Sequence, residues 1–321
     1  MSKIKNYLSL VKFSHTIFAM PFALIGFFLG VFALLFYKPA VGINNLPHEF
    51  LESIEASDFT NLWKLFFIKL IFVIGCMVFA RSAAMAFNRW LDKNFDAKNP
   101  RTAIREIPAG VIKSNNALLF VIVNCLLFIA CCFFINTICF YLSPVALFVV
   151  LFYSYTKRFT ALCHLVLGVG LSLAPIGAYL AVTGQFALLP ILFSFTVLFW
   201  VSGFDIIYAL QDKEFDKSNQ LHSIPAALGK SKALMVSNLL HVLSAVCVIS
   251  AGVYGHFGLW YWIGVAIFCG LLIYQHSLVK PNDLRKVNIA FFTTNGIASV
   301  VFAIFVILDL FYYKKWLEFL Q

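Results

Sequence analysis

Charged residues are scarce in this chain of 321 residues: Asp, Glu, Lys and Arg make up 12% of it, and only 14 residues are acidic. In a typical soluble domain about a quarter of the residues are charged. The hydrophobic fraction is 62%, 37 residues are Phe, and the mean hydropathy is +0.90. This composition excludes an ordinary soluble domain and indicates an all-α, polytopic membrane protein.

The chain also lacks a long polar segment that could form a second, soluble domain. A hydrocarbon core about 30 Å thick needs roughly 20 apolar residues per helix. We therefore predict one integral-membrane domain over residues 1–321, a bundle of nine transmembrane helices. The predicted spans are 13–36, 65–87, 117–135, 138–155, 162–183, 186–210, 233–255, 257–277 and 288–312. The boundary between the third and fourth spans is the least defined, because only Asn136 and Thr137 separate them.

Neither a C-x-x-C pair nor a small-residue cleavage site after the first apolar segment is present. That segment is too long for the core of a signal peptide, so we expect Met1 to start the mature protein. All eight cysteines fall inside apolar spans, where they are expected to be core or lipid-facing residues. The sequence therefore predicts neither a disulfide framework nor a zinc site.

Long basic arms are missing as well, although the formal net charge is +10. Of the 24 Lys and Arg residues, 18 lie before the first span or in alternate loops on one face of the membrane. The loops of the other face hold only Lys38 and Lys64, and Lys314 with Lys315 follow the last span. By the positive-inside rule, we predict a plasma (inner) membrane protein with a cytoplasmic N-terminus, cytoplasmic basic loops and an external C-terminus. This distribution also argues against nucleic-acid binding.

A polar stripe follows the second predicted span. Asn88, Asp92 and Asp96 are each four residues apart, so on a helix they would share one face. Like charges at this spacing repel each other, but a divalent cation would reverse that effect. Mg²⁺ prefers oxygen ligands and is usually held by one or two carboxylates together with substrate phosphates. From spacing alone, a magnesium site and a solvated acidic helix end both remain open.

A second stripe makes the magnesium interpretation stronger. Asp212 and Asp216 are again four residues apart, on a later loop of the same predicted face, and each stripe is followed by Ile-Pro-Ala. Five of the eight Asp residues are Asp92, Asp96, Asp205, Asp212 and Asp216. Asp205 lies about two turns inside the sixth span, where an ionisable group is costly and suggests a functional site or a structural ion pair.

Basic and aromatic residues accompany the two stripes. Arg101 and Arg105, four residues apart, suit a bidentate grip on an anion. Tyr153, Lys157 and Arg158 lie at the end of the fourth span, where a simple positive-inside anchor would also explain the two basic residues.

These motifs resemble those of UbiA-type membrane prenyltransferases, whose signatures are N-x-x-x-D-x-x-x-D and D-x-x-x-D on cytoplasmic loops, with Y-x-x-x-K between them. The matching residues here are Asn88, Asp92 and Asp96; Tyr153 and Lys157; and Asp212 and Asp216. The stretches AFNRWLDKNFDAKNPRTAIREIPAG and FDIIYALQDKEFD are similar to the bacterial 4-hydroxybenzoate polyprenyltransferase branch, a UbiA-like quinone-pathway group. One departure is Arg89, where many relatives have Asp.

The resemblance implies a UbiA-type fold and the Mg²⁺-dependent transfer of a polyprenyl group from a polyprenyl diphosphate to a small aromatic acceptor within the lipid bilayer. The implied acceptor is 4-hydroxybenzoate or a related aromatic acid of quinone biosynthesis, with a dihydroxynaphthoate as the alternative. The metal ligands would be Asn88, Asp92, Asp96, Asp212 and Asp216. Catalytic roles would fall to Asp205, Arg81, Tyr153 and Lys157, and substrate-binding roles to Arg101, Arg105, Tyr208 and Arg158.

A membrane transporter is the rival interpretation, because transporters are also polytopic, with internal repeats and buried charges. Their binding sites lie near the middle of the bilayer on broken helices. Here the carboxylates gather at one predicted membrane interface, which favours the enzyme.

Overall fold

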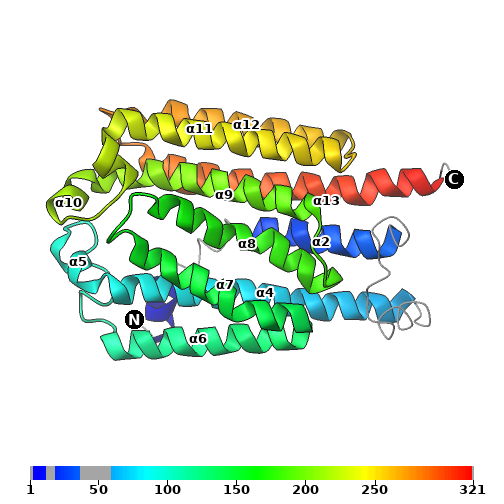
Figure 1. The fold of residues 1–321 in the computed structure, drawn as a ribbon, viewed down its shortest axis with the longest axis horizontal. Helices are drawn as coiled ribbons and strands as arrows, with labels where there is room; N and C mark the ends of the chain where they lie inside the picture. Colours follow the sequence, from blue (N-terminus) through cyan, green and yellow to red (C-terminus); the bar gives the residue numbers. More distant parts are fainter. Residues whose placement is uncertain (1–2, 12–18, 37–58, 320–321) are drawn as a thin grey trace.

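The computed structural model describes residues 3–11, 19–36 and 59–319, and over this part of the chain it contains helices and no strands. Its helices run along one common direction as a bundle (Figure 1). The longer ones are α2 (Met20–Phe36), α4 (Phe59–Leu91), α6 (Ser114–Ile135), α7 (Thr137–Thr156), α8 (Cys163–Thr183), α9 (Leu188–Ala209), α11 (Ile224–Tyr254), α12 (Leu259–Leu278) and α13 (Asn295–Phe319). The short ones are α1 (Lys3–Leu10), α5 (Lys93–Lys98), η3 (Leu210–Asp212), α10 (Lys213–Ser218) and η4 (Ile289–Thr294).

Eight of the described helices are long and apolar enough to cross a membrane, and a shorter apolar helix covers Met20–Leu35. The predicted all-α membrane bundle is thus confirmed, with a helix count close to the nine predicted. The start of the first predicted span and the loop holding Lys38 lie outside the described residues. The third and fourth spans are indeed separate: α6 ends at Ile135, and the side chain of Asn136 caps α7 by accepting a hydrogen bond from the backbone N–H of Cys139 at 2.8 Å.

Helix α9 packs between α8 and α11, and small residues allow the close approach. A Cβ atom on Gly168 of α8 would lie 2.5 Å from the backbone oxygen of Leu198 in α9. A Cβ atom on Gly203 of α9 would lie 2.3 Å from the His241 ring in α11. In membranes, where apolar burial does not drive helices together, such small-residue contacts are a main source of packing. They fix the rotation of α9, which carries the second acidic motif at its end.

The short helices α5 and α10 lie at one end of the bundle, as does α1, whereas α13 ends at the opposite end (Figure 1). Helix α11 begins at the same end with a kink at Gly229, whose φ of 79° is strained for other residues. Both predicted acidic motifs therefore meet at a single end of the bundle. Which side of a membrane this end faces stays a prediction.

Candidate active site between the two acidic motifs

The two acidic motifs share one local backbone design. In each, a long helix stops, the first Asp adopts a bridge conformation, and a six-residue helix carries the second Asp. Asp92 has φ −92° and ψ 6° before α5, and Asp212 has φ −97° and ψ 2° before α10. The spacing of Asn88, Asp92 and Asp96 suggested one continuous helix. In the structure the helix is instead interrupted at Asp92, between α4 and α5. The backbone N–H of Asp96 still donates to the carbonyl of Asp92 at 2.8 Å, so the spacing of four survives the break.

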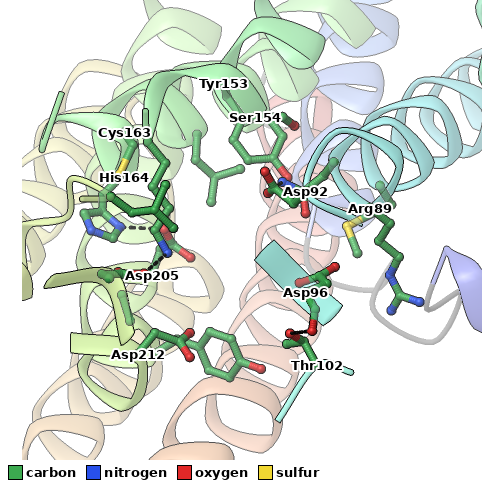
Figure 2. A pocket seen from close by; sticks show the side chains of 18 of the residues that line it. Arg89, Asp92, Asp96, Thr102, Tyr153, Ser154, Cys163, His164, Asp205 and Asp212 are labelled. Carbon is green, nitrogen blue, oxygen red and sulfur yellow. Dashed lines mark hydrogen bonds and ion pairs between the residues drawn. The ribbon is translucent and has the colours of Figure 1, made fainter. Parts of the chain in front are cut away.

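A cavity of about 290 Å³ opens between the motifs (Figure 2). It is lined by all the predicted site residues except Arg158: Arg81, Asn88, Asp92, Asp96, Arg101, Arg105, Tyr153, Lys157, Asp205, Tyr208, Asp212 and Asp216. Arg158 is not itself a lining residue, but it pairs with Asp92, which is. Apolar residues complete the wall, among them Leu167, Phe204 and Phe291. The cavity lining therefore combines charged and apolar side chains, as an amphiphilic ligand requires.

In the first motif each carboxylate is paired with its own arginine. Arg158 donates to Asp92 Oδ1 at 2.8 Å, and Arg105 donates to both oxygens of Asp96, at 2.8 and 2.9 Å. Two carboxylates one turn apart repel each other, and the two separate cations offset that repulsion. Arg105, predicted to bind the substrate, is paired here with a protein carboxylate, and its role in substrate binding stays a prediction.

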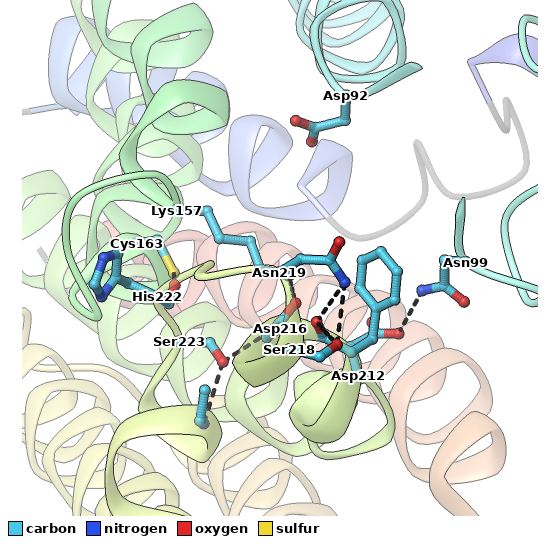
Figure 3. A network of polar contacts seen from close by, with 12 residues as sticks. Asp92, Asn99, Lys157, Cys163, Asp212, Asp216, Ser218, Asn219, His222 and Ser223 are labelled. Atoms are coloured by element: carbon cyan, nitrogen blue, oxygen red, sulfur yellow. Dashed lines mark hydrogen bonds and ion pairs between the residues drawn. The ribbon is translucent and has the colours of Figure 1, made fainter. Parts of the chain in front are cut away.

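In the second motif, too, each carboxylate has a basic partner, and hydrogen bonds from Asn99 to Asp212 and from Ser223 to Asp216 add to the network (Figure 3). Arg101 forms a bidentate ion pair with Asp212 and donates to the Tyr208 hydroxyl at 2.9 Å. Lys157 lies 2.7 Å from Asp216 Oδ1, and the Ser223 hydroxyl donates to Asp216 Oδ2 at 2.9 Å. Since Arg101 comes from the loop of the first motif, its ion pair with Asp212 ties the two motifs together across the cavity.

Burial and neighbouring charges have opposite effects on the pKa values of two residues that line the cavity, Asp92 and Lys157. Burial raises the pKa of Asp92 above its ordinary value, although the charge of Arg158 acts in the opposite direction. Burial alone would lower the pKa of Lys157, but the Asp216 carboxylate outweighs it and the pKa is raised. Lys157 therefore stays cationic at neutral pH and is suited to binding an anion.

Arg81 differs from the other arginines of the cavity because it has no carboxylate partner among the described residues. Its Nε atom is buried and forms no hydrogen bond there. Tyr153 lies close enough to interact electrostatically with Arg81, Asp92 and Asp205. Arg81 as a whole is half-buried, but a buried N–H group without a partner is costly, and an anionic ligand would satisfy it.

Asp205 has a partner that the sequence interpretation missed. His164, the second residue of α8, places Nδ1 2.7 Å from Asp205 Oδ2 (Figure 2). Both residues line the cavity. The available signal was an ionisable residue at the start of an apolar span, which is by default a functional candidate.

Arg89, the departure from the motif of many relatives, is accounted for by its neighbours. The side chain is 4% exposed and forms an ion pair with Glu106, which also accepts a hydrogen bond from Ser9 of α1. Its charge is thus used within the fold, linking α1, α4 and the loop after α5.

The carboxylate and amide oxygens that line the cavity are the types of ligand that a magnesium ion prefers. Among the described residues, no three acidic, His or Cys side chains converge into a preformed metal cage. Mg²⁺ does not need one, because it commonly takes one or two carboxylates and completes its shell with water and phosphate oxygens. The residues therefore fit the metal, provided that the basic partners of the carboxylates release them when it binds.

Comparisons with known proteins agree with this geometry. The model of the UbiA prenyltransferase family matches residues 55–297. A 4-hydroxybenzoate octaprenyltransferase of Nitrosospira multiformis is 31% identical over 236 residues, 74% of this chain and 81% of that protein. One from Tolumonas auensis is 31% identical over 239 residues, 74% of this chain and 82% of that protein.

Solved structures extend the likeness to nearly the whole fold. The apo structure of a UbiA homologue from Aeropyrum pernix superposes with a TM-score of 0.75 at 27% identity, covering 92% of this chain and 98% of that one. A UbiA homologue from Archaeoglobus fulgidus, bound to GPP and Mg²⁺, gives a TM-score of 0.65 at 17% identity, covering 95% and 99%.

Proposed function

The chain belongs to the UbiA prenyltransferase family and is a membrane-bound prenyltransferase, and from this premise we propose that it transfers a polyprenyl group from a polyprenyl diphosphate to 4-hydroxybenzoate, with Mg²⁺. The observation that supports this best is the composition of one cavity. It is lined by the two ion-paired acidic motifs, by Arg81, whose buried Nε atom has no partner among the described residues, and by apolar side chains.

The diphosphate end of the donor is assigned to the cavity mouth. Asp92, Asp96, Asp212 and Asp216, with Asn88, would hold Mg²⁺, which when bound neutralises charge that develops on the departing diphosphate. Lys157, Arg101 and Arg105 would turn from their carboxylates to the phosphate oxygens. Metal and diphosphate should therefore bind cooperatively, since each takes one half of the existing ion pairs.

The hydrocarbon end and the reacting carbon need an environment without water. The wall residues Leu167, Phe204 and Phe291 supply apolar surface next to the charged mouth. The Tyr208 ring stacks on Phe291 with a centroid distance of 4.2 Å. Aromatic faces attract an allylic cation through their electron density, and the apolar wall keeps water away from it.

The acceptor is assigned to the side of the cavity that holds Arg81 and Asp205. An aryl carboxylate would satisfy the unpaired guanidinium of Arg81, and a phenolic hydroxyl could donate to Asp205. 4-Hydroxybenzoate carries these two groups at opposite ends of one ring. Bacterial relatives named 4-hydroxybenzoate octaprenyltransferase support this choice of acceptor.

A product assay tests the proposal. Purified protein in liposomes receives Mg²⁺, a polyprenyl diphosphate and one of three acceptors: 4-hydroxybenzoate, 4-hydroxybenzamide or a dihydroxynaphthoate. We expect C-prenylated 4-hydroxybenzoate, with the amide at least about tenfold poorer because Arg81 loses an ionic partner. Arg81→Gln should abolish the preference for the acid over the amide. Efficient prenylation of the dihydroxynaphthoate alone, or of no aromatic acceptor, would overturn the assignment.

A further inference from the structure

His164 lies where three helices meet beside the acceptor side of the cavity. It is the second residue of α8, and its ring contacts Asp205 of α9. The backbone N–H of Ile224, the first residue of α11, donates to its Nε2 at 3.4 Å. The side chain is 3% exposed, whereas that of Asp205 is 24% exposed. The ring is therefore almost fully buried, and the carboxylate is the more exposed of the two groups at the cavity.

The hydrogen bonds assign the proton of the ring. The backbone N–H of Ile224 points at Nε2, which favours the tautomer in which Nδ1 carries the hydrogen, and Nδ1 then donates it to Asp205 Oδ2. Within the described chain, the second carboxylate oxygen, Oδ1, has no hydrogen-bond partner. One oxygen of Asp205 is thus fixed from behind, and the other is left for a ligand in the cavity.

Asp205 is held differently from the other carboxylates of the cavity. The four motif aspartates each face a Lys or Arg that can move to a phosphate group. Asp205 has instead a short, buried imidazole, anchored to the start of α11. The loop before α11 holds the start of α8 at a second point, because the thiol of Cys163, next to His164, donates to the carbonyl of His222 at 3.5 Å (Figure 3). Such an arrangement suits a carboxylate that keeps its orientation while ligands come and go.

We propose that His164 is a positioning residue for the acceptor: it orients Asp205 so that Oδ1 accepts a hydrogen bond from the acceptor's hydroxyl group. The inference rests on the proposed function, since it presupposes an aromatic acceptor that carries a hydroxyl. It makes Asp205 and His164 an acceptor-binding pair, separate from the four aspartates that serve the diphosphate. A separation of this kind predicts that the two substrates respond differently to changes at His164.

Two substitutions isolate the hydrogen bond. In His164→Asn the amide nitrogen takes the place of Nδ1 and can still donate to Asp205. In His164→Leu the volume is similar but the donor is lost. His222→Leu serves as a matched control, because His222 is exposed, lies in the adjoining loop and does not line the cavity.

The measurement is steady-state kinetics in liposomes, varying 4-hydroxybenzoate and the polyprenyl diphosphate separately. For His164→Leu we expect the acceptor KM to rise about tenfold to a hundredfold, the range for loss of a charge-assisted hydrogen bond. The KM for the diphosphate should stay within about twofold, as it should for both substrates in His222→Leu. His164→Asn should recover most of the acceptor affinity. Thermal unfolding of each variant reports whether it is folded.

Equal impairment of the Asn and Leu variants would overturn the positioning role, as would parallel changes in both KM values, because either result indicates a purely structural residue. If His164→Leu does not fold, His164→Gln replaces it in the comparison with His164→Asn. The Gln amide takes the place of Nε2 and not of Nδ1, so His164→Gln should not restore the acceptor affinity. Wild-type protein without activity on any aromatic acceptor would refute the proposed function itself. Active wild type with unaffected His164 variants would refute this inference alone.

Discussion

Replacing Asp212 with Asn removes one negative charge from the centre of the site and keeps the size of the side chain. In the structure Asp212 accepts from Arg101 in a bidentate ion pair and from Asn99 Nδ2 at 3.4 Å. The pair is partly exposed, 33% for Arg101 and 14% for Asp212, so breaking it should cost about 1 kcal/mol of stability at most. The variant is therefore expected to fold.

The effect on catalysis should be much larger than the effect on stability. An amide cannot supply the anionic oxygen that Mg²⁺ prefers, so charge on the departing diphosphate would be less well neutralised. A loss of about 4 kcal/mol corresponds to about a thousandfold in rate. If both motifs act on one diphosphate, as proposed, adding Asp92→Asn to Asp212→Asn should cost much less than the product of the two single losses.

Prenyl transfer in liposomes, normalised to folded protein, measures these effects. The matched control is Asp283→Asn, because Asp283 is 40% exposed, pairs with the exposed Arg285 and does not line the cavity. It should keep the activity of the wild type. Near-normal turnover of folded Asp212→Asn, or strictly multiplicative losses in the double variant, would refute the paired-carboxylate mechanism.

Three further predictions concern the metal, the topology and the far end of the bundle. Exhaustive chelation with EDTA should abolish prenyl transfer and added Mg²⁺ should restore it; full turnover after chelation would contradict the metal assignment. Cysteines introduced at Ser114 and Ser218 should react with an impermeant reagent only from the cytoplasmic side, and one at Gly184 only from outside; labelling of Ser114 and Ser218 from opposite sides would exclude a shared site. Asp309 is 1% exposed and accepts hydrogen bonds from the backbone N–H groups of Gly258 at 2.8 Å and of Tyr261 at 3.1 Å, which caps the start of α12. Asp309→Leu should therefore lower the free energy of unfolding by about 1–3 kcal/mol, and Asp309→Asn should lower it less. Neither variant should lose activity. Melting temperatures check this, and two variants as stable as wild type would show that the cap contributes nothing.

The elements of this fold could be predicted because their signals are local. Runs of about 20 apolar residues define the spans, and the spacing of four within each acidic motif survives even where the helix breaks at Asp92. The alternation of basic loops by itself predicts that both motifs lie on one face of the membrane. The enzyme interpretation holds against the rival transporter, because the carboxylates gather at one end of the bundle and the chain belongs to an enzyme family.

The partners of the charged residues could not be predicted, because they depend on helix rotation and on contacts distant in sequence. His164 and Asp205 are 41 residues apart, and Arg101 and Asp212 are 111 apart. Their meeting follows from how α8, α9 and the loop after α5 pack together. Arg89 stands out in the sequence only as a departure from a motif, and its role in the fold depends on Glu106, which lies beside it.

The position of the metal relative to both motifs is the most direct test of the account. Crystals grown with Mn²⁺ in place of Mg²⁺ and a non-reactive thio-analogue of the polyprenyl diphosphate would locate the metal by anomalous scattering. We predict anomalous density in contact with carboxylates of both motifs, Asp92 or Asp96 on one side and Asp212 or Asp216 on the other, with the diphosphate between them. Metal density at one motif alone, or none near either while the diphosphate is bound, would contradict the central claim.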